Sequence, residues 1–143
     1  MMRIIIRSVQ RPDNESPEAL IHWFCTVFDL SEPNGVSIEE QILKEFVNAA
    51  YNNRGLSSTE LSSVHELARS TVIYHLNRLL EIGLLVKQGR RYYLRANEMS
   101  RAIEEMQFDL EREMRKMMMA AMEFDRAMSQ RARGTLQNEQ RQQ

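Results

Sequence analysis

The stretch 56–95 constrains the fold most, because a helical pattern passes directly into a hairpin pattern. Residues 69–82 repeat apolar side chains at the spacing of one buried helical face. A short helix precedes them, since Ser57 and Glu60 have the spacing of a capping box. Two apolar runs around Gly89 follow, and this pattern is typical of a two-stranded hairpin. The predicted order is therefore helix, turn, helix and hairpin.

The side of helix 69–82 opposite its apolar stripe is rich in hydrogen-bonding groups. This side carries Ser70, Tyr74, Asn77 and Arg78, with Thr71 at its flank. The net charge of the whole chain is −1, but residues 54–95 hold seven bases and three acids, a local charge of +4. A basic patch beside hydrogen-bond donors on one helix is expected of a surface that meets phosphate groups.

Several pieces of this stretch form a pattern that is more specific than any one of them. The pieces are Ser70-Thr71-Val72, His75-Leu76, Gly83-Leu84 and Gly89-Arg90-Arg91-Tyr92-Tyr93-Leu94. Together they resemble the winged helix-turn-helix of ArsR-type repressors, and MarR-type regulators are similar at lower specificity. The resemblance implies an α+β, mostly helical fold with a two-stranded wing.

The resemblance also implies that helix 69–82 enters the major groove of double-stranded DNA. It implies that Arg90 and Arg91 of the wing contact the DNA backbone or the minor groove. The predicted DNA-binding residues are Ser58, Thr59, Arg69, Ser70, Thr71, Tyr74, His75, Asn77, Arg78, Lys87, Arg90 and Arg91. Other roles stay open for some of them. Tyr74 is alternatively a cap on the hydrophobic surface, His75 a packing residue, and Arg90 and Arg91 a solvated hairpin tip.

The sequence departs from the family pattern at the turn between the two helices. Ala68 stands where a capping serine is usual, Glu66 where glycine is common, and His65 where an apolar residue is common. Metal-sensing members carry cysteines in the first helix of this unit, and this chain has none there. His22 and Cys25 are spaced to share a metal, but two ligands are too few for a structural zinc site. We therefore predict no metal and no cofactor.

The first 54 residues are predicted to pack on the core or on a dimer partner. Residues 2–9 are rich in β-branched side chains, which favours a strand, and the alternative is an ordered arm. Helices are expected over 18–30 and from residue 38 to about 52. Gly55 is the predicted left-handed stop after the second of them.

A long C-terminal helix is predicted over 98–133, because these residues contain neither proline nor glycine. Apolar residues recur along it at heptad spacing, with Glu113 as a break, which indicates a coiled-coil homodimer. The predicted dimerisation residues are Met99, Ile103, Met106, Leu110, Met117, Ala120 and Phe124. Its methionine-rich part contains Met114, Met117, Met118, Met119 and Met122. Methionine side chains suit either a loosely packed dimer interface or an adaptable binding surface. Residues 134–143 are predicted to be a flexible tail.

No pattern indicates an enzyme, since no phosphate-cradling glycine loop and no nucleophile–base arrangement emerges from the spacing. One cysteine excludes an internal disulfide framework and fits a reducing, cytoplasmic location. No segment approaches the length of a membrane span.

The predicted organisation is an N-terminal part (1–54), a DNA-binding unit (55–96), a dimerisation helix (97–133) and a tail (134–143). The predicted function is that of a sequence-specific, homodimeric, double-stranded-DNA-binding transcriptional regulator. Two alternatives stay open. One is a winged-helix protein–protein interaction module in a multisubunit assembly. The other is a ligand-sensing regulator whose N-terminal helices bind an unidentified small-molecule effector.

Overall fold

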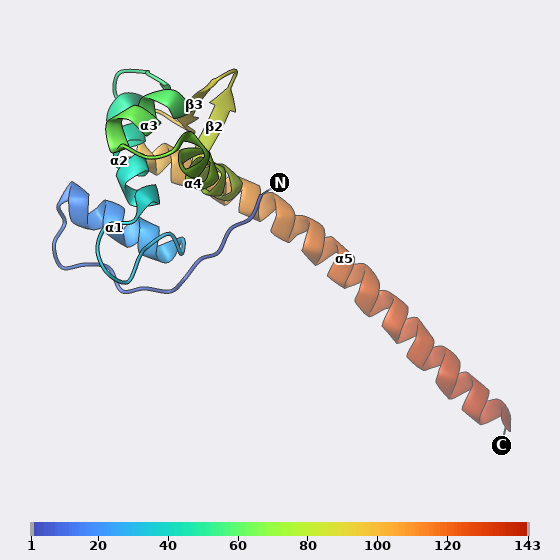
Figure 1. Cartoon of the computed structure of the whole chain (residues 1–143). Coiled ribbons are helices and arrows are strands. Elements are labelled where there is room, and N and C mark those ends of the chain that lie inside the picture. The colour runs from blue at the N-terminus through green and yellow to red at the C-terminus, as the bar shows by residue number, and fades with distance from the viewer. Residues whose placement is uncertain (1, 143) are drawn as a thin grey trace. The chain divides into compact units, whose positions relative to one another are not determined.

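The computed structural model describes residues 2–142 and confirms an α+β, mostly helical fold (Figure 1). Contacts divide the chain into two compact units, Met1–Met106 and Gln107–Gln143. The first unit contains α1 (Pro17–Val27), α2 (Ile38–Ala50), β1 (Leu56–Ser57), α3 (Ser58–His65), α4 (Arg69–Ile82), β2 (Leu85–Gln88), β3 (Arg91–Leu94) and the start of α5 (Met99–Gln142). The rest of α5 forms the second unit. The predicted parts 1–54 and 55–96 therefore belong to one compact unit.

The sheet has three antiparallel strands in the order β1-β3-β2. β2 pairs with β3 from Leu85 opposite Leu94 to Gln88 opposite Arg91, as the hairpin pattern predicts. The third strand, β1, was not predicted, and it extends the sheet beyond the two strands of the hairpin. It pairs Leu56 with Tyr92. Two residues are too short to show the alternation by which a strand is recognised in a sequence.

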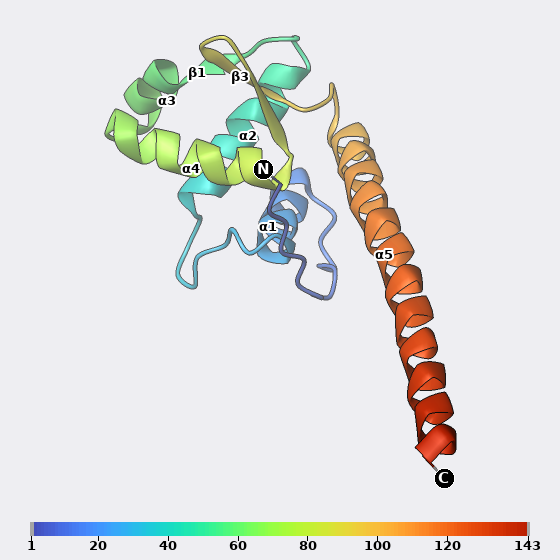
Figure 2. The same cartoon turned by 90° about the vertical axis from the view of Figure 1, so that its right-hand side faces the viewer.

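Side-chain caps fix the starts of three helices. Ser16, Ser37 and Ser57 each accept a hydrogen bond from a first-turn amide of α1, α2 and α3. The turn after α3 runs through Glu66, which adopts a left-handed conformation with φ of 53°. α4 then begins after Ala68, which has no capping side chain. Figure 2 shows α3 and α4 joined end to end by this short turn.

The core of the first unit lies where α2, α4 and the sheet meet. Its fully buried members include apolar residues that recur at helical spacing, namely Ile42, Leu43 and Phe46 of α2 and Val72, Leu76 and Leu79 of α4. Replacing one such leucine with alanine typically costs about 2–5 kcal/mol. This packing fixes which side of α4 turns outward.

The N-terminal segment 2–9 is not a strand, contrary to one of the two predictions. Single backbone hydrogen bonds hold it, from Arg3 N to the Glu81 carbonyl and from Arg7 N to the Val27 carbonyl, each 2.7 Å long. One bond goes to α4 and the other to α1, so the segment forms no ladder of hydrogen bonds with a strand. The alternative prediction, an ordered arm, describes the segment correctly.

Helix ends differ from the predictions where local backbone conformation decides them. α1 ends at Val27 rather than residue 30, because Asp29 takes a left-handed φ of 60°. After α2 the left-handed residue is Asn53, not Gly55. A β-carbon at Gly55 would lie 2.5 Å from the Tyr93 ring, so this glycine serves close packing. α5 continues to Gln142 through the predicted tail, whose Gln, Glu and Arg residues favour helix.

Candidate functional site

The outward side of α4 presents a row of polar side chains. Arg69, Ser70, Tyr74 and Asn77 are exposed there, and Thr71 is half-buried at the flank. Tyr74 keeps 61% of its surface exposed and meets the His75 ring edge-on at 5.0 Å. α4 has neither a side-chain cap nor an acidic residue in its first turn. Its first amide groups are therefore free to attract a negatively charged group.

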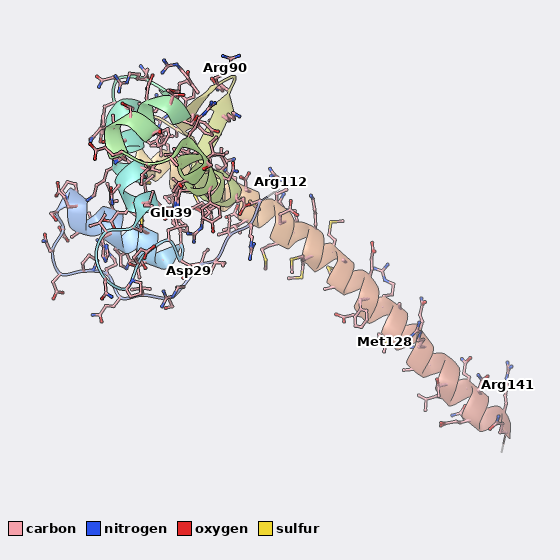
Figure 3. All side chains as sticks on the ribbon, viewed as in Figure 1. Asp29, Glu39, Arg90, Arg112, Met128 and Arg141 are labelled. Carbon is pink, nitrogen blue, oxygen red and sulfur yellow. The ribbon has the colours of Figure 1, made fainter. Side chains whose placement is uncertain are left out.

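The β2–β3 hairpin places cations beside one another. Lys87, Gly89, Arg90 and Arg91 are exposed, and Gly89 adopts a left-handed φ of 63° at the turn. Figure 3 shows Arg90 at the tip of the hairpin. Within residues 2–142, Arg90 makes no hydrogen bond or ion pair. Its charge is thus uncompensated by the part of the chain that the structure describes.

Arg91 is tied to the body of the unit, unlike its neighbour. Its Nη1 donates to the Gly55 carbonyl at 2.8 Å, and its Nη2 lies 3.0 Å from Glu60 Oε1. Lys87 Nζ lies 5.4 Å from the centre of the Tyr92 ring. The Arg91 contacts link the hairpin to α3 and to Gly55, the residue before β1, so Arg91 supports the hairpin as well as carrying charge.

Two predicted DNA-binding residues, His75 and Arg78, turn inward to Glu39 of α2. His75 Nδ1 lies 2.6 Å and Arg78 Nη1 lies 2.5 Å from Glu39 Oε1, and the Glu39 side chain is 1% exposed. Arg78 Nη2 also donates to the Asp29 carbonyl at 3.2 Å. A buried carboxylate with two donors on α4 fixes α4 against α2.

Sequence reasoning missed Glu39 because its two partners lie 36 and 39 residues away. Glu39 resembles an ordinary first-turn acid after the Ser37 cap. The available signal was the i, i+3 spacing of His75 and Arg78 at the edge of the apolar face of α4. A histidine and an arginine at the border of a buried face require a hydrogen-bond acceptor or solvent.

At the start of α3, the two predicted contact residues differ. Ser58 is 6% exposed, and its Oγ accepts a hydrogen bond from Arg69 Nε at 3.2 Å. Thr59 is exposed. Ser58 therefore positions Arg69, while Thr59 and the Arg69 guanidinium are accessible from outside the unit.

The predicted dimerisation residues fall into two groups along α5. Met106 is 3% exposed, and Met99 and Ile103 pack partly buried against the core of the first unit. In the second unit, Met117 is 62% and Phe124 is 64% exposed, while Ala120 is exposed and Leu110 half-exposed. The first three residues therefore serve the core, and the later ones remain accessible.

His22 and Cys25, the pair whose spacing would let them share a metal, both lie near the Glu40 carboxylate. His22 Nδ1 lies 2.6 Å from Glu40 Oε1, and Lys44 Nζ lies 3.5 Å from the other oxygen of this buried carboxylate. Burial raises the pKa of the Cys25 thiol from about 9 to about 12, with the Glu40 and Glu39 carboxylates adding to the shift and Lys44 opposing it. Residues 2–142 contain no group of three His, Cys, Asp or Glu placed to hold a metal ion.

Several hollows border these elements, and two of them lie beside helices of the first unit. One, of about 540 Å³, lies between the N-terminal arm and α4 and is lined by residues that include Arg3, Tyr74 and Asn77. The other, of about 300 Å³, lies between α1 and α2 and is lined by residues that include Ile21, Val47 and Tyr51. The second is where the sequence placed an effector pocket, and both contain polar and apolar groups.

Comparisons of the chain with models of protein families, with curated proteins and with solved structures found no match. Among residues 2–142, no helix has both the length and the apolar character that a membrane crossing requires.

Proposed function

We propose that the chain is a winged-helix regulator that binds double-stranded DNA as a homodimer. One observation carries the proposal: α4 offers Ser70, Tyr74 and Asn77 on an exposed side, and the neighbouring hairpin offers Arg90, whose charge no residue within 2–142 compensates. In such a protein, α4 lies in the major groove and the β2–β3 hairpin is the wing. The resemblance of the sequence to ArsR-type repressors supports the same assignment.

The residues of the proposed DNA-binding surface have different roles. Ser70, Tyr74 and Asn77 carry hydrogen-bonding groups that suit base edges and phosphates. Arg69, Lys87 and Arg90 carry positive charge that suits phosphate groups. His75, Arg78 and Ser58 are engaged inside the protein, so we assign them to positioning α4 and Arg69 rather than to DNA contact.

The test is a titration of labelled duplex DNA at several salt concentrations. We expect Arg90→Ala to weaken binding to all sequences and to reduce the salt slope by about one. Asn77→Ala should weaken binding to a selected site more than to random duplex, because a base contact carries sequence preference. Arg101→Ala is the matched control, since Arg101 is an exposed arginine on α5 paired with Glu98.

Absence of binding at low salt and micromolar protein would rule out the DNA-binding proposal. The second candidate, a protein-docking winged helix, would then take its place. Its supporting observation is the exposure of two large hydrophobic side chains, Val64 of α3 at 66% and Tyr74 of α4 at 61%. Substituting Val64 should leave DNA binding unchanged under the first proposal.

A further inference from the structure

A further hollow, of about 390 Å³, lies where the loop after α2 meets the sheet. Figure 2 shows β1 beside β3, with the loop from α2 leading into β1. The lining residues come from this loop, from β3 and from the start of α3, and they are Asn53, Arg54, Gly55, Arg91, Tyr93 and Glu60. None of them belongs to α4, so the hollow is distinct from the exposed polar row on that helix.

Side chains that donate hydrogen bonds line this hollow. Arg54 and Arg91 bring guanidinium groups, Asn53 an amide and Tyr93 a phenol hydroxyl. Within residues 2–142, the side chains of Asn53, Arg54 and Tyr93 make no hydrogen bond or ion pair. Their donors are therefore available to a bound group.

The backbone of the loop holds Arg54 next to β3. The Arg54 amide donates to the Ala49 carbonyl at 3.0 Å, and Arg91 Nη1 donates to the Gly55 carbonyl at 2.8 Å. The hydroxyl-bearing carbon of Tyr93 lies 2.5 Å from where a β-carbon on Gly55 would stand. Because residue 55 is a glycine, the loop and the Tyr93 ring approach closely, and donors from the loop and from β3 border one hollow.

The charges at the hollow favour an anion. Arg54 and Arg91 bring two positive charges, and Glu60 brings a negative one. Glu60 Oε1 lies 3.0 Å from Arg91 Nη2, so this pair compensates itself and leaves the Arg54 charge without a partner within residues 2–142. The Arg91 guanidinium keeps further N–H groups beyond those directed at Gly55 and Glu60. Planar guanidinium groups bind the oxygens of phosphate in pairs.

We propose that this hollow binds a phosphate group, which Arg54 and Arg91 hold while Asn53 and Tyr93 add hydrogen bonds. The phosphate belongs either to a DNA backbone or to a free phosphate compound. The site stands on its own residues, whereas DNA as the source rests on the function proposed above. Two features of position favour DNA. Arg91 adjoins Arg90 at the hairpin tip, and the first helix of a helix-turn-helix crosses the DNA backbone.

Titration of the full-length protein with sodium phosphate tests the site, with backbone amide NMR signals as the readout. We expect saturable shifts confined to residues 53–55 and 91–93, and none with sodium chloride at the same ionic strength. Arg54→Ala should weaken phosphate binding about tenfold, the effect expected for loss of a charge-assisted hydrogen bond. Arg11→Ala is the matched control and should change nothing, since Arg11 is an exposed arginine outside the hollow.

A variant at Glu60 should change phosphate affinity in the opposite direction, which damage to the fold cannot imitate. Glu60→Gln removes the acid that lines the hollow and releases Arg91 from its ion pair. Phosphate affinity should therefore rise severalfold. Glu32→Gln removes an exposed acid outside the hollow and controls for net charge, so it should leave the affinity unchanged.

Titration with duplex DNA then identifies the source of the phosphate. If the source is the DNA backbone, Arg54→Ala should weaken binding to all sequences and reduce the salt slope by about one, beyond any effect of Arg11→Ala. Unchanged DNA affinity together with lost phosphate shifts would assign the site to a free phosphate compound. Phosphate shifts in a protein that binds no DNA would refute the regulator and support the site. The inference is overturned if Arg54→Ala behaves like Arg11→Ala with both phosphate and DNA.

Discussion

Glu39 is the residue that most clearly determines how α4 is held. Its carboxylate is buried and accepts hydrogen bonds from His75 and Arg78, which are both on α4. We expect Glu39→Gln to lower the free energy of unfolding by about 1–3 kcal/mol, because an amide leaves part of this charged pairing unmade. Urea denaturation measures the change. Glu32→Gln, at an exposed loop position, is the control and should have no effect. Equal stability of the two variants would contradict this role for Glu39.

The buried thiol of Cys25 makes the stability of the fold depend on alkaline pH. The pKa of its thiol is about 12 in the folded protein and about 9 when exposed. The folded state therefore keeps a proton that the unfolded state loses, so the free energy of unfolding falls as the pH rises from 9 toward 12. Below pH 9 this group contributes no pH dependence. Cys25→Ala should remove this part of the alkaline loss, measured as the difference between two urea–pH series.

Reaction of Cys25 with a thiol reagent checks the same burial directly. At pH 8 the folded protein should react far more slowly than the protein in urea, because the reactive species is the exposed thiolate. Similar rates in the two solutions would show that Cys25 is accessible in the folded state.

At the scale of the element, the turn between α3 and α4 contains a strained residue. Glu66 holds a left-handed φ of 53° at the C-terminal end of α3. Glycine adopts this conformation without the steric cost of a β-carbon. Glu66→Gly should therefore raise the free energy of unfolding by about 0.5–1 kcal/mol. Glu66→Ala keeps the β-carbon and should give no such gain in a thermal or urea melt. A loss with glycine would show that the Glu66 side chain stabilises the turn.

The elements that sequence analysis predicted well are those with a repeating signal. α4 and its buried face follow from the spacing of Val72, Leu76 and Leu79, and the hairpin follows from the apolar runs around Gly89. β1 has only two residues, and its position in the sheet depends on the pairing of Leu56 with Tyr92, 36 positions later. The inward turn of His75 and Arg78 likewise depends on a distant carboxylate. Periodicity carries no information on such pairings, because they are set by tertiary packing.

The boundary between the two compact units lies within α5, after Met106, and not at the start of that helix. The predicted dimerisation helix starts at residue 97, but Ala102 and Met106 of α5 are 0% and 3% exposed in the first unit. A chain shortened to end at Asn97 would lose both side chains from the core. We expect it to be less stable by several kcal/mol, since deleting a buried methionine side chain alone costs about 2–5 kcal/mol.

A chain shortened to end at Met106 instead keeps the whole first unit and removes the exposed apolar residues of α5, such as Met117 and Phe124. It should unfold cooperatively in urea, run as a monomer in light scattering, and still bind duplex DNA through α4 and the hairpin. Its affinity for a two-site duplex should fall by roughly 10²–10⁴, because the second binding event is no longer intramolecular. A tight dimer of this shortened chain would show that the dimer interface lies in the first unit. The exposed apolar residues of the second unit would then not form the dimer interface.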